Sequence, residues 1–302
     1  MKTKNIVLNS HNEEIIQYTI PHWLHSFEHT ILDDTILKYI PLHWHEELQF
    51  ILVKHGTIEI RLLGKSFLVS KGSGFFINSG LIHEIHPIDK GSIFICWNTG
   101  TSGFDEHLQE KIIRALIEEQ TMPYLRLDPH NTTYNQILKL ISDSFTKFEE
   151  AKSGFELLIS SNYLRCLYEL VNSMDSFNSV KVQVYDQRIK QLLHYIHSHY
   201  KSKITLDDLS RLIYLSTAET NRLFKKYMRS SPFAYILDYR LERSVELLVR
   251  TQSSITEIAL ETGFSNVSYY IKKFKLKYNT TPLKYRGSNR NISMPFRGDY
   301  AE

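Results

Sequence analysis

The chain has 302 residues, which is enough for two domains. Its 42% hydrophobic content, with 18 Tyr and 16 Phe, excludes a disordered chain, and no stretch of about 18 apolar residues offers a membrane-spanning helix. Residues 1–184 hold 16 Lys and Arg against 22 Asp and Glu, a net charge of −6, whereas residues 185–302 hold 20 against 11, a net charge of +9. This asymmetry predicts that the C-terminal part meets a polyanion, either nucleic acid or an anionic membrane face.

The N-terminal segment and the cysteines indicate a cytoplasmic protein. The first 20 residues have no apolar run after their lysines, so a signal peptide is not expected. The two cysteines, Cys96 and Cys166, lie in apolar or helical contexts without CxxC spacing. Both are therefore expected to be buried thiols in a reducing compartment.

Residues 40–98 are expected to form a β-barrel or a β-sandwich. Runs of about five or six β-branched and aromatic residues alternate there with glycine-containing turns. Eleven of the 14 histidines lie at or before residue 130. Along one strand, alternation would put four polar side chains on the same face, namely His43, His45, Glu47 and Gln49. Polar groups inside a small barrel need partners, which a ligand, water or a metal would supply.

Two segments of this region resemble the motifs of the cupin family. The segment "HWHEELQF", followed by Gly56, is similar to the first cupin motif, and "GSGFFINSGLIH" is similar to the second. In metal-binding cupins this resemblance implies ligands at His43, His45, position 49 and His83, but position 49 is Gln and Asn78 replaces the usual Pro. A neutral amide is a poor metal ligand, so we expect no metal and no other cofactor. We instead assign effector binding to five side chains: His43, His45, Glu47, Gln49 and His83.

The segments that flank the barrel are aromatic before it and helical after it. Three apolar stripes at helical spacing predict helices at residues 104–119, 131–152 and 155–175. These helices can cover an open side of the barrel or form a dimer interface, and the residues alone do not decide between the two. The stripe expected on the third helix consists of Leu157, Leu158, Leu164, Leu167, Tyr168 and Val171. The aromatic residues expected to fold over the mouth of the barrel as a lid are Tyr18, His22 and Trp23.

The basic part contains an internal repeat. Phe224-Lys225 recurs 50 residues later, as does Pro232, and "TLDDL" at 205–209 is matched by "SITEI" 49 residues later. Such self-similarity predicts two copies of one structural unit. The spacing of apolar residues in each copy predicts a helix, a tight turn and a second helix.

Start and stop signals delimit the helices of both copies. In the second copy, Gly263 can close the first helix in the left-handed conformation, and Ser265 is predicted to cap the helix that follows. In the first copy the turn is expected at Tyr214-Leu215. Ser216 is predicted to cap the next helix, and Glu219 completes a capping box three residues later.

The outer face of each second helix carries polar and cationic side chains. A helix that enters a DNA groove needs an apolar face toward its own domain and an outer face that meets bases and phosphates. A solvated helical bundle would also carry lysines, but two copies with a matching charge excess favour DNA binding. The predicted DNA-binding residues are Thr217, Ala218, Asn221, Arg222, Lys225 and Lys226 in the first copy and Asn266, Ser268, Tyr269, Lys272, Lys273 and Lys277 in the second.

Residues from about 186 to 287 resemble the DNA-binding region of the AraC/XylS family of transcription regulators. The matching segments include "SITEIALETGFSNVSYYIKKFK" and "TPLKYR". The resemblance implies seven helices, with two recognition helices in successive major-groove segments, held apart by a long helix over about 232–249 that Ser231 can cap. It further implies that the barrel binds an effector and that the helices after it pair two chains. Arg229 and Ser210 stand where the family usually has Gly and Ala.

The sequence therefore predicts an α+β multidomain protein, with an N-terminal cupin-like β-barrel, appended helices, and a C-terminal all-α domain with two helix-turn-helix units. The expected function is a cytoplasmic transcription regulator, not an enzyme. Its expected partners are double-stranded DNA, a small-molecule effector and a second copy of the chain, but not a membrane. RNA polymerase is a further candidate partner. A sugar is the first candidate effector by analogy with the family.

Two alternatives compete with this function. One is a metal-dependent cupin enzyme fused to a DNA-binding module, and the other is a DNA-organising protein with an empty barrel. No Ser/His/Asp set, Gly-rich phosphate loop or paired carboxylates stand out for catalysis. The expected boundaries are 1–175 for the effector-binding and dimerisation domain, 176–187 for a polar linker, 188–287 for the DNA-binding domain and 288–302 for a flexible tail.

Overall fold

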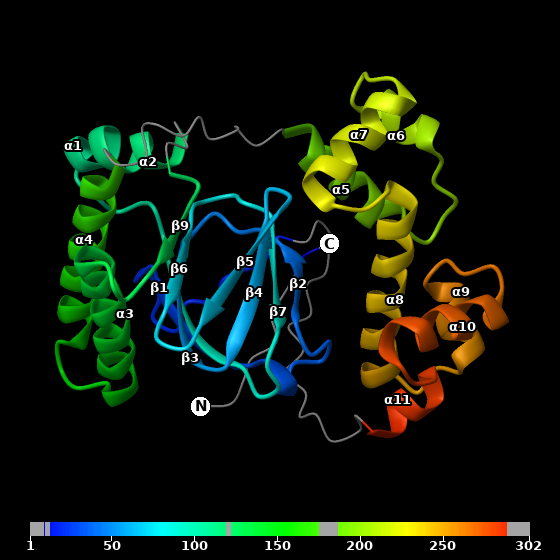
Figure 1. The fold of residues 1–302 in the computed structure, drawn as a ribbon, viewed down its shortest axis with the longest axis horizontal. Coiled ribbons are helices and arrows are strands. Elements are labelled where there is room, and N and C mark those ends of the chain that lie inside the picture. Colours follow the sequence, from blue (N-terminus) through cyan, green and yellow to red (C-terminus); the bar gives the residue numbers. More distant parts are fainter. Residues whose placement is uncertain (1–8, 10–12, 119–121, 175–186, 289–302) are drawn as a thin grey trace. The chain divides into compact units, whose positions relative to one another are not determined.

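The described residues from Glu13 onward form two compact units, one over residues 13–118 and 122–174 and one over residues 187–288 (Figure 1). The computed structural model describes residues 9, 13–118, 122–174 and 187–288. Apart from Gln187 and Ser288, the predicted linker and the predicted tail lie outside the described residues. No helix among the described residues is both long enough and apolar enough to cross a membrane.

The described part of the N-terminal unit contains nine strands in two antiparallel sheets. The five-stranded sheet has the order β1-β8-β3-β6-β9, and the four-stranded sheet has the order β2-β7-β4-β5. The predicted cupin-like barrel is thus a sandwich whose sheets are not hydrogen-bonded into a closed barrel. The strands are β1 (His25–Ile31), β2 (Ile40–His43), β3 (Leu48–His55), β4 (Thr57–Leu62), β5 (Lys65–Ser70), β6 (Gly74–Ile77), β7 (His83–Pro87), β8 (Ile93–Thr99) and β9 (Tyr124–Leu127), with a 3₁₀ turn at Leu32–Asp34.

Helices cover the outer face of the five-stranded sheet (Figure 1). Ile137 and Ile141 of α3 (Thr132–Glu150) join Phe50, Phe76 and Trp97 of the sheet in one buried cluster. Since strand β3 has this layer on one side and the second sheet on the other, its first six residues are all buried rather than alternating. The first predicted helix is instead a short irregular series, α1 (Glu106–Leu108), a π-helical turn (Gln109–Ile113) and α2 (Arg114–Glu118).

Helix α4 (Phe155–Met174) buries a different face from the one predicted. Its buried residues are Ile159, Tyr163, Cys166, Leu167 and Leu170. Most of the predicted stripe faces outward instead: Leu157 is 77% exposed, Leu158 52%, Leu164 48% and Tyr168 65%. Because α4 carries apolar side chains on both faces, its sequence does not reveal which face packs on the sheet. Cys96 and Cys166 are buried and unbridged, as predicted.

The C-terminal unit contains seven helices within the described residues, the number that the family resemblance implied. Helices α6 and α7 form the first helix-turn-helix, α9 and α10 form the second, and α8 separates them. Ser231 caps α8 by accepting a hydrogen bond from the backbone N–H of Ala234, with Pro232 in the first turn. The helices are α5 (Gln187–His199), α6 (Leu206–Leu212), α7 (Thr217–Met228), α8 (Pro232–Arg250), α9 (Ile255–Glu261), α10 (Val267–Tyr278) and α11 (Pro282–Ser288).

The two turns are alike except for one inserted residue. Gly263 has φ +85°, the predicted left-handed conformation, and Tyr214 holds the equivalent place in the first turn with φ +54°. Ser216 caps α7 in a capping box with Glu219, as predicted. The prediction that Ser265 caps α10 is wrong, because Asn266 accepts the hydrogen bond from the N–H of Tyr269. The second turn is one residue longer, which is why the sequence offset changes from 49 to 50.

Candidate DNA-binding surface and effector site

Helix α7 separates a buried face from an exposed cationic face. Thr220, Phe224 and Tyr227 point into the C-terminal unit and are buried. Of the six residues predicted to contact DNA, Asn221 is half-buried and the others are exposed: Thr217, Ala218, Arg222, Lys225 and Lys226. An exposed guanidinium beside exposed ammonium groups can bind guanine edges and phosphates.

Helix α10 presents a mixed outer face. Tyr270 and Phe274 are buried, whereas Ser268, Tyr269 and Lys272 are exposed. Lys273 is half-buried, with its Nζ 5.4 Å from the centroid of the Tyr269 ring. The exposed Asn266 uses its side-chain oxygen to cap the helix. Its NH₂ group is therefore the part of this side chain that can address a base.

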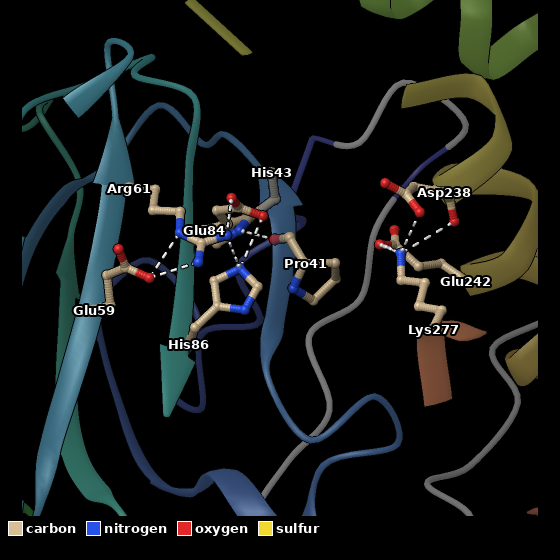
Figure 2. A network of polar contacts seen from close by, with 9 residues as sticks. All are labelled: Pro41, His43, Glu59, Arg61, Glu84, His86, Asp238, Glu242 and Lys277. Carbon is tan, nitrogen blue, oxygen red and sulfur yellow. Dashed lines mark hydrogen bonds and ion pairs between the residues drawn. The ribbon is translucent and has the colours of Figure 1, made fainter. Parts of the chain in front are cut away.

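The structure changes the interpretation of Lys277. Its Nζ lies 3.0 Å from Oε1 of Glu242 and 3.3 Å from Oδ1 of Asp238, both on α8 (Figure 2). Burial alone would lower the pKa of Lys277, but the attraction of the two carboxylates outweighs it and raises this pKa. Lys277 thus joins α10 to α8, and we no longer assign it a phosphate contact. Its partners lie 35 and 39 residues away, so α10's own sequence does not reveal them.

Three of the predicted effector-binding residues form one buried cluster. One ring nitrogen from each of His43, His45 and His83 lies within 4.8 Å of the others, and all three side chains are buried. His43 ends β2 and pairs with His83 of β7, while His45 lies in the connection to β3. Burial lowers the pKa of His45 to about 4 and the pKa of His83 well below its usual value, so both rings are neutral near pH 7.

The expectation that residues 43 to 49 share one strand face is wrong. The chain leaves the four-stranded sheet after His43 and enters the five-stranded sheet at Leu48. Gln49 consequently lies opposite Asn98 of β8, and its Nε2 donates to Asn98 Oδ1 at 3.1 Å. The carboxylate of Glu47 lies 3.8 Å from Nδ1 of His45 and accepts a hydrogen bond of 2.7 Å from the Tyr18 hydroxyl. Burial raises the pKa of the Glu47 carboxyl, and the bond from Tyr18 only partly offsets this.

The three residues predicted to form a lid lie in different surroundings. Tyr18 donates to Glu47, whereas His22 is exposed. Trp23 packs against Phe148 and Phe155, and its Nε1 donates to Ser160 Oγ at 3.3 Å. Trp23 therefore belongs to the contact between β1 and the α3–α4 pair.

Sequence reasoning missed Glu14, a buried carboxylate beside the histidine cluster. Its Oε2 lies 3.4 Å from Nε2 of His43, and its backbone N–H donates to the carbonyl of Trp44 at 2.8 Å. Burial alone would raise the pKa of Glu14, but its hydrogen bond and attraction to His43 outweigh burial and lower it. No local pattern around Glu14 signals this role, because a bridge between residues 13 and 44 creates the contact.

Comparison with known proteins identifies the family. Residues 26–167 match the family described as an AraC-like ligand binding domain, and residues 209–288 match a helix-turn-helix domain. YdeC of Bacillus subtilis, described as an uncharacterized HTH-type transcriptional regulator, is 30% identical over 95% of this chain and 99% of its own length. The lactose operon transcription activator of Staphylococcus xylosus is 22% identical over 78% of this chain and 82% of its own. The chain therefore belongs to the AraC family of transcriptional regulators, with a ligand-binding domain followed by a helix-turn-helix domain.

Proposed function

We propose that this protein binds a specific DNA sequence through α7 and α10 and thereby regulates transcription under the control of a small-molecule effector. The observation that carries this proposal is the pair of helices whose inner faces bury Phe224 and Phe274 while their outer faces expose Arg222 and Lys272. The proposed DNA contacts are Thr217, Ala218, Asn221, Arg222, Lys225, Lys226, Asn266, Ser268, Tyr269, Lys272 and Lys273.

The proposed effector site lies at the histidine cluster of the N-terminal unit. Nε2 of His45 and of His83 are buried and have no hydrogen-bond partner among the described residues. The same holds for Oε1 of Gln49. Such acceptors suit the hydroxyl groups of a polyol, and a relative named as a lactose operon activator supports a sugar as the first class to test. His43 and Glu47 complete the proposed site.

One variant tests the link between the effector site and DNA binding. His83→Ala should abolish the effector response while ligand-free operator affinity stays within about twofold, because His83 belongs to the other unit. A coupling of about 1–3 kcal/mol is typical, and operator DNA should tighten effector binding by the same factor. Thermal shift with a sugar panel would identify the effector, and titration with operator present would measure the coupling. A variant that responds like wild type would move the sensing site elsewhere.

We further propose that the exposed apolar stripe of α4 pairs two chains. Leu157, Leu164 and Tyr168 recur at spacings of seven and four, so they share one side of the helix. Leu164→Glu should shift the protein toward monomer in sedimentation equilibrium. The matched control is Lys139→Glu on the exposed side of α3, which should leave the assembly state unchanged. A Leu164→Glu protein that remains as associated as wild type would refute this interface.

A regulatory role is proposed in preference to catalysis, since the family consists of transcriptional regulators. RNA polymerase is the further partner we propose, and the cytoplasm is the proposed compartment. Failure of the wild-type protein to select any sequence from random duplex DNA would overturn the proposed function, whatever its N-terminal unit binds.

A further inference from the structure

The three clustered histidines share one hydrogen-bonding pattern, in which Nδ1 of each ring faces a backbone carbonyl oxygen. The Nδ1 atoms of His43 and His83 lie 2.8 Å from the carbonyl oxygens of Pro41 and Leu81. Nδ1 of His45 lies 3.1 Å from the carbonyl oxygen of Glu47. A carbonyl oxygen only accepts, so each Nδ1 carries the hydrogen. The neutral rings of His45 and His83 then keep their lone pair on Nε2, whereas Nε2 of His43 faces the carboxylate of Glu14 at 3.4 Å. Backbone carbonyls fix metal-binding histidines in the same way.

Without a cation between them, these buried lone pairs destabilise the folded protein. Nε2 of His45 and of His83 are buried acceptors without a donor among the described residues, and a buried acceptor that loses its water without gaining a donor destabilises the fold. A positive ion between the lone pairs would satisfy them together.

Glu14 supplies negative charge at the edge of this cluster. The residue is 6% exposed, and its Oε2 faces Nε2 of His43 at 3.4 Å. A buried carboxylate beside imidazole ligands partly balances the charge of a divalent ion. The amide of Gln49 is directed to Asn98 instead. The carboxylate that faces an Nε2 atom of this cluster thus comes from the segment that precedes the first sheet, whereas the carboxylate of Glu47 lies 3.8 Å from Nδ1 of His45.

We propose that His43, His45 and His83 bind one divalent first-row transition-metal ion through Nε2, with Glu14 as the carboxylate ligand. In a tetrahedral zinc site the ligating nitrogens lie about 3.3 Å apart. The three ring nitrogens lie within 4.8 Å of one another, so a small inward shift of the rings would bring them to that spacing. This proposal replaces the expectation of no metal, which rested on Gln49. The claim that the ion lies in the effector site rests on the proposed function. The claim that these residues bind a metal ion does not.

The proposal has a regulatory consequence. Glu14 is tied to the chain between the histidines by the N–H bond to Trp44, and Tyr18, four residues later, bonds to Glu47. An ion held by Glu14 would therefore fix residues 14–18 against the pocket. An effector that displaces or completes this coordination would release or hold the same segment.

The test measures metal binding by the untagged full-length protein after treatment with a chelator. Elemental analysis should find one Zn²⁺ per chain, Zn²⁺ should raise the melting temperature, and Co²⁺ should give the visible absorption of a tetrahedral site. His83→Ala should weaken Zn²⁺ binding more than about 100-fold, and Glu14→Gln by about 10–100-fold. If His83→Ala does not fold, the Zn²⁺ stoichiometry of the wild-type protein and the Zn²⁺ affinity of Glu14→Gln still test whether the cluster binds a metal ion.

The matched control is His86→Ala. His86 Nε2 also faces a carboxylate, Glu84 Oε2 at 3.0 Å, but within a separate half-buried network with Arg61 (Figure 2). This variant should bind Zn²⁺ like wild type. The proposal is overturned if the wild-type protein binds no stoichiometric Zn²⁺ or Co²⁺, if Glu14→Gln and His86→Ala behave alike, or if a sugar binds to the metal-free pocket and metals do not. Loss of operator binding with intact metal binding would count against the proposed function alone.

Discussion

The two helix-turn-helix units share one design but differ in what surrounds the turn. Tyr214 occupies the left-handed position of the first turn and is 94% exposed, so its side chain meets solvent. Gly263 occupies that position in the second turn and faces the α5–α6 connection. A Cβ on Gly263 would lie 2.7 Å from the carbonyl oxygen of Tyr200 and 2.9 Å from that of Lys201. The first turn thus tolerates a side chain, whereas the second is packed against backbone.

This difference shows how the second helix-turn-helix is held in place within the C-terminal domain. Arg240 of α8 donates from Nε to the carbonyl of Tyr200 at 2.7 Å and from Nη2 to that of Ser202 at 2.8 Å. Gly263 and Arg240 therefore meet the same short connection. Together they fix the position of the second turn relative to α8, and so help to set the spacing of the two recognition helices.

The largest expected effect on stability comes from substituting the residue in the left-handed position of each turn. Gly263→Val should destabilise the C-terminal unit by about 3 kcal/mol or more, because it adds a strained φ and a clash with two carbonyls. Tyr214→Gly should change stability by less than about 1 kcal/mol, because relief of strain and added chain entropy oppose each other. Urea unfolding of the full chain measures both. Equal effects at the two sites would remove the contrast between the turns.

A smaller effect separates the lysines of the two recognition helices. Lys277→Ala should destabilise the protein by about 1–2 kcal/mol, between the values for exposed and buried ion pairs, since it leaves Asp238 and Glu242 without their cation. Lys225→Ala should leave stability unchanged and reduce the slope of log K against log salt by about 0.9. The interpretation fails if Lys277→Ala lowers the salt slope as Lys225→Ala does while the protein keeps full stability.

The smallest expected effect concerns the start of α10. Asn266→Ala should cost about 1 kcal/mol, because it leaves the N–H of Tyr269 without its acceptor. Ser265→Ala should stay within about 0.5 kcal/mol, since Ser265 is exposed and outside the helix. In the first helix-turn-helix, Ser216→Ala should cause the corresponding loss of stability, because Ser216 caps α7. A larger loss of stability for Ser265→Ala than for Asn266→Ala would contradict the assignment of Asn266 as the cap of α10.

The sequence predicts those features that short-range signals determine. The cap at Ser216, the start of α8 at Pro232 and the left-handed Gly263 are local, and the structure confirms all three. Ser265 was misassigned although the change of offset from 49 to 50 already signals an inserted residue. The two offsets place the insertion between residues 258 and 274, and the structure places it in the second turn.

Features set by distant partners could not be predicted. The role of Lys277 depends on carboxylates of another helix, and the pocket position of Glu14 depends on its bridge to the segment after β2. The buried face of α4 depends on the sheet beneath it, because both of its faces are apolar. His43, His45 and His83 were grouped correctly, but through a motif resemblance rather than through strand alternation, which failed at Gln49.

Base preference is the most direct test of the central claim that each helix-turn-helix reads DNA. An operator obtained by selection from random duplexes would be scanned base by base with wild type, Arg222→Ala and Lys272→Ala. Each variant should lose about 1–3 kcal/mol of specific binding free energy and its preference at a different position, about one helical turn apart. Variants that both retain wild-type affinity and base preference would contradict the assignment of α7 and α10 as recognition helices.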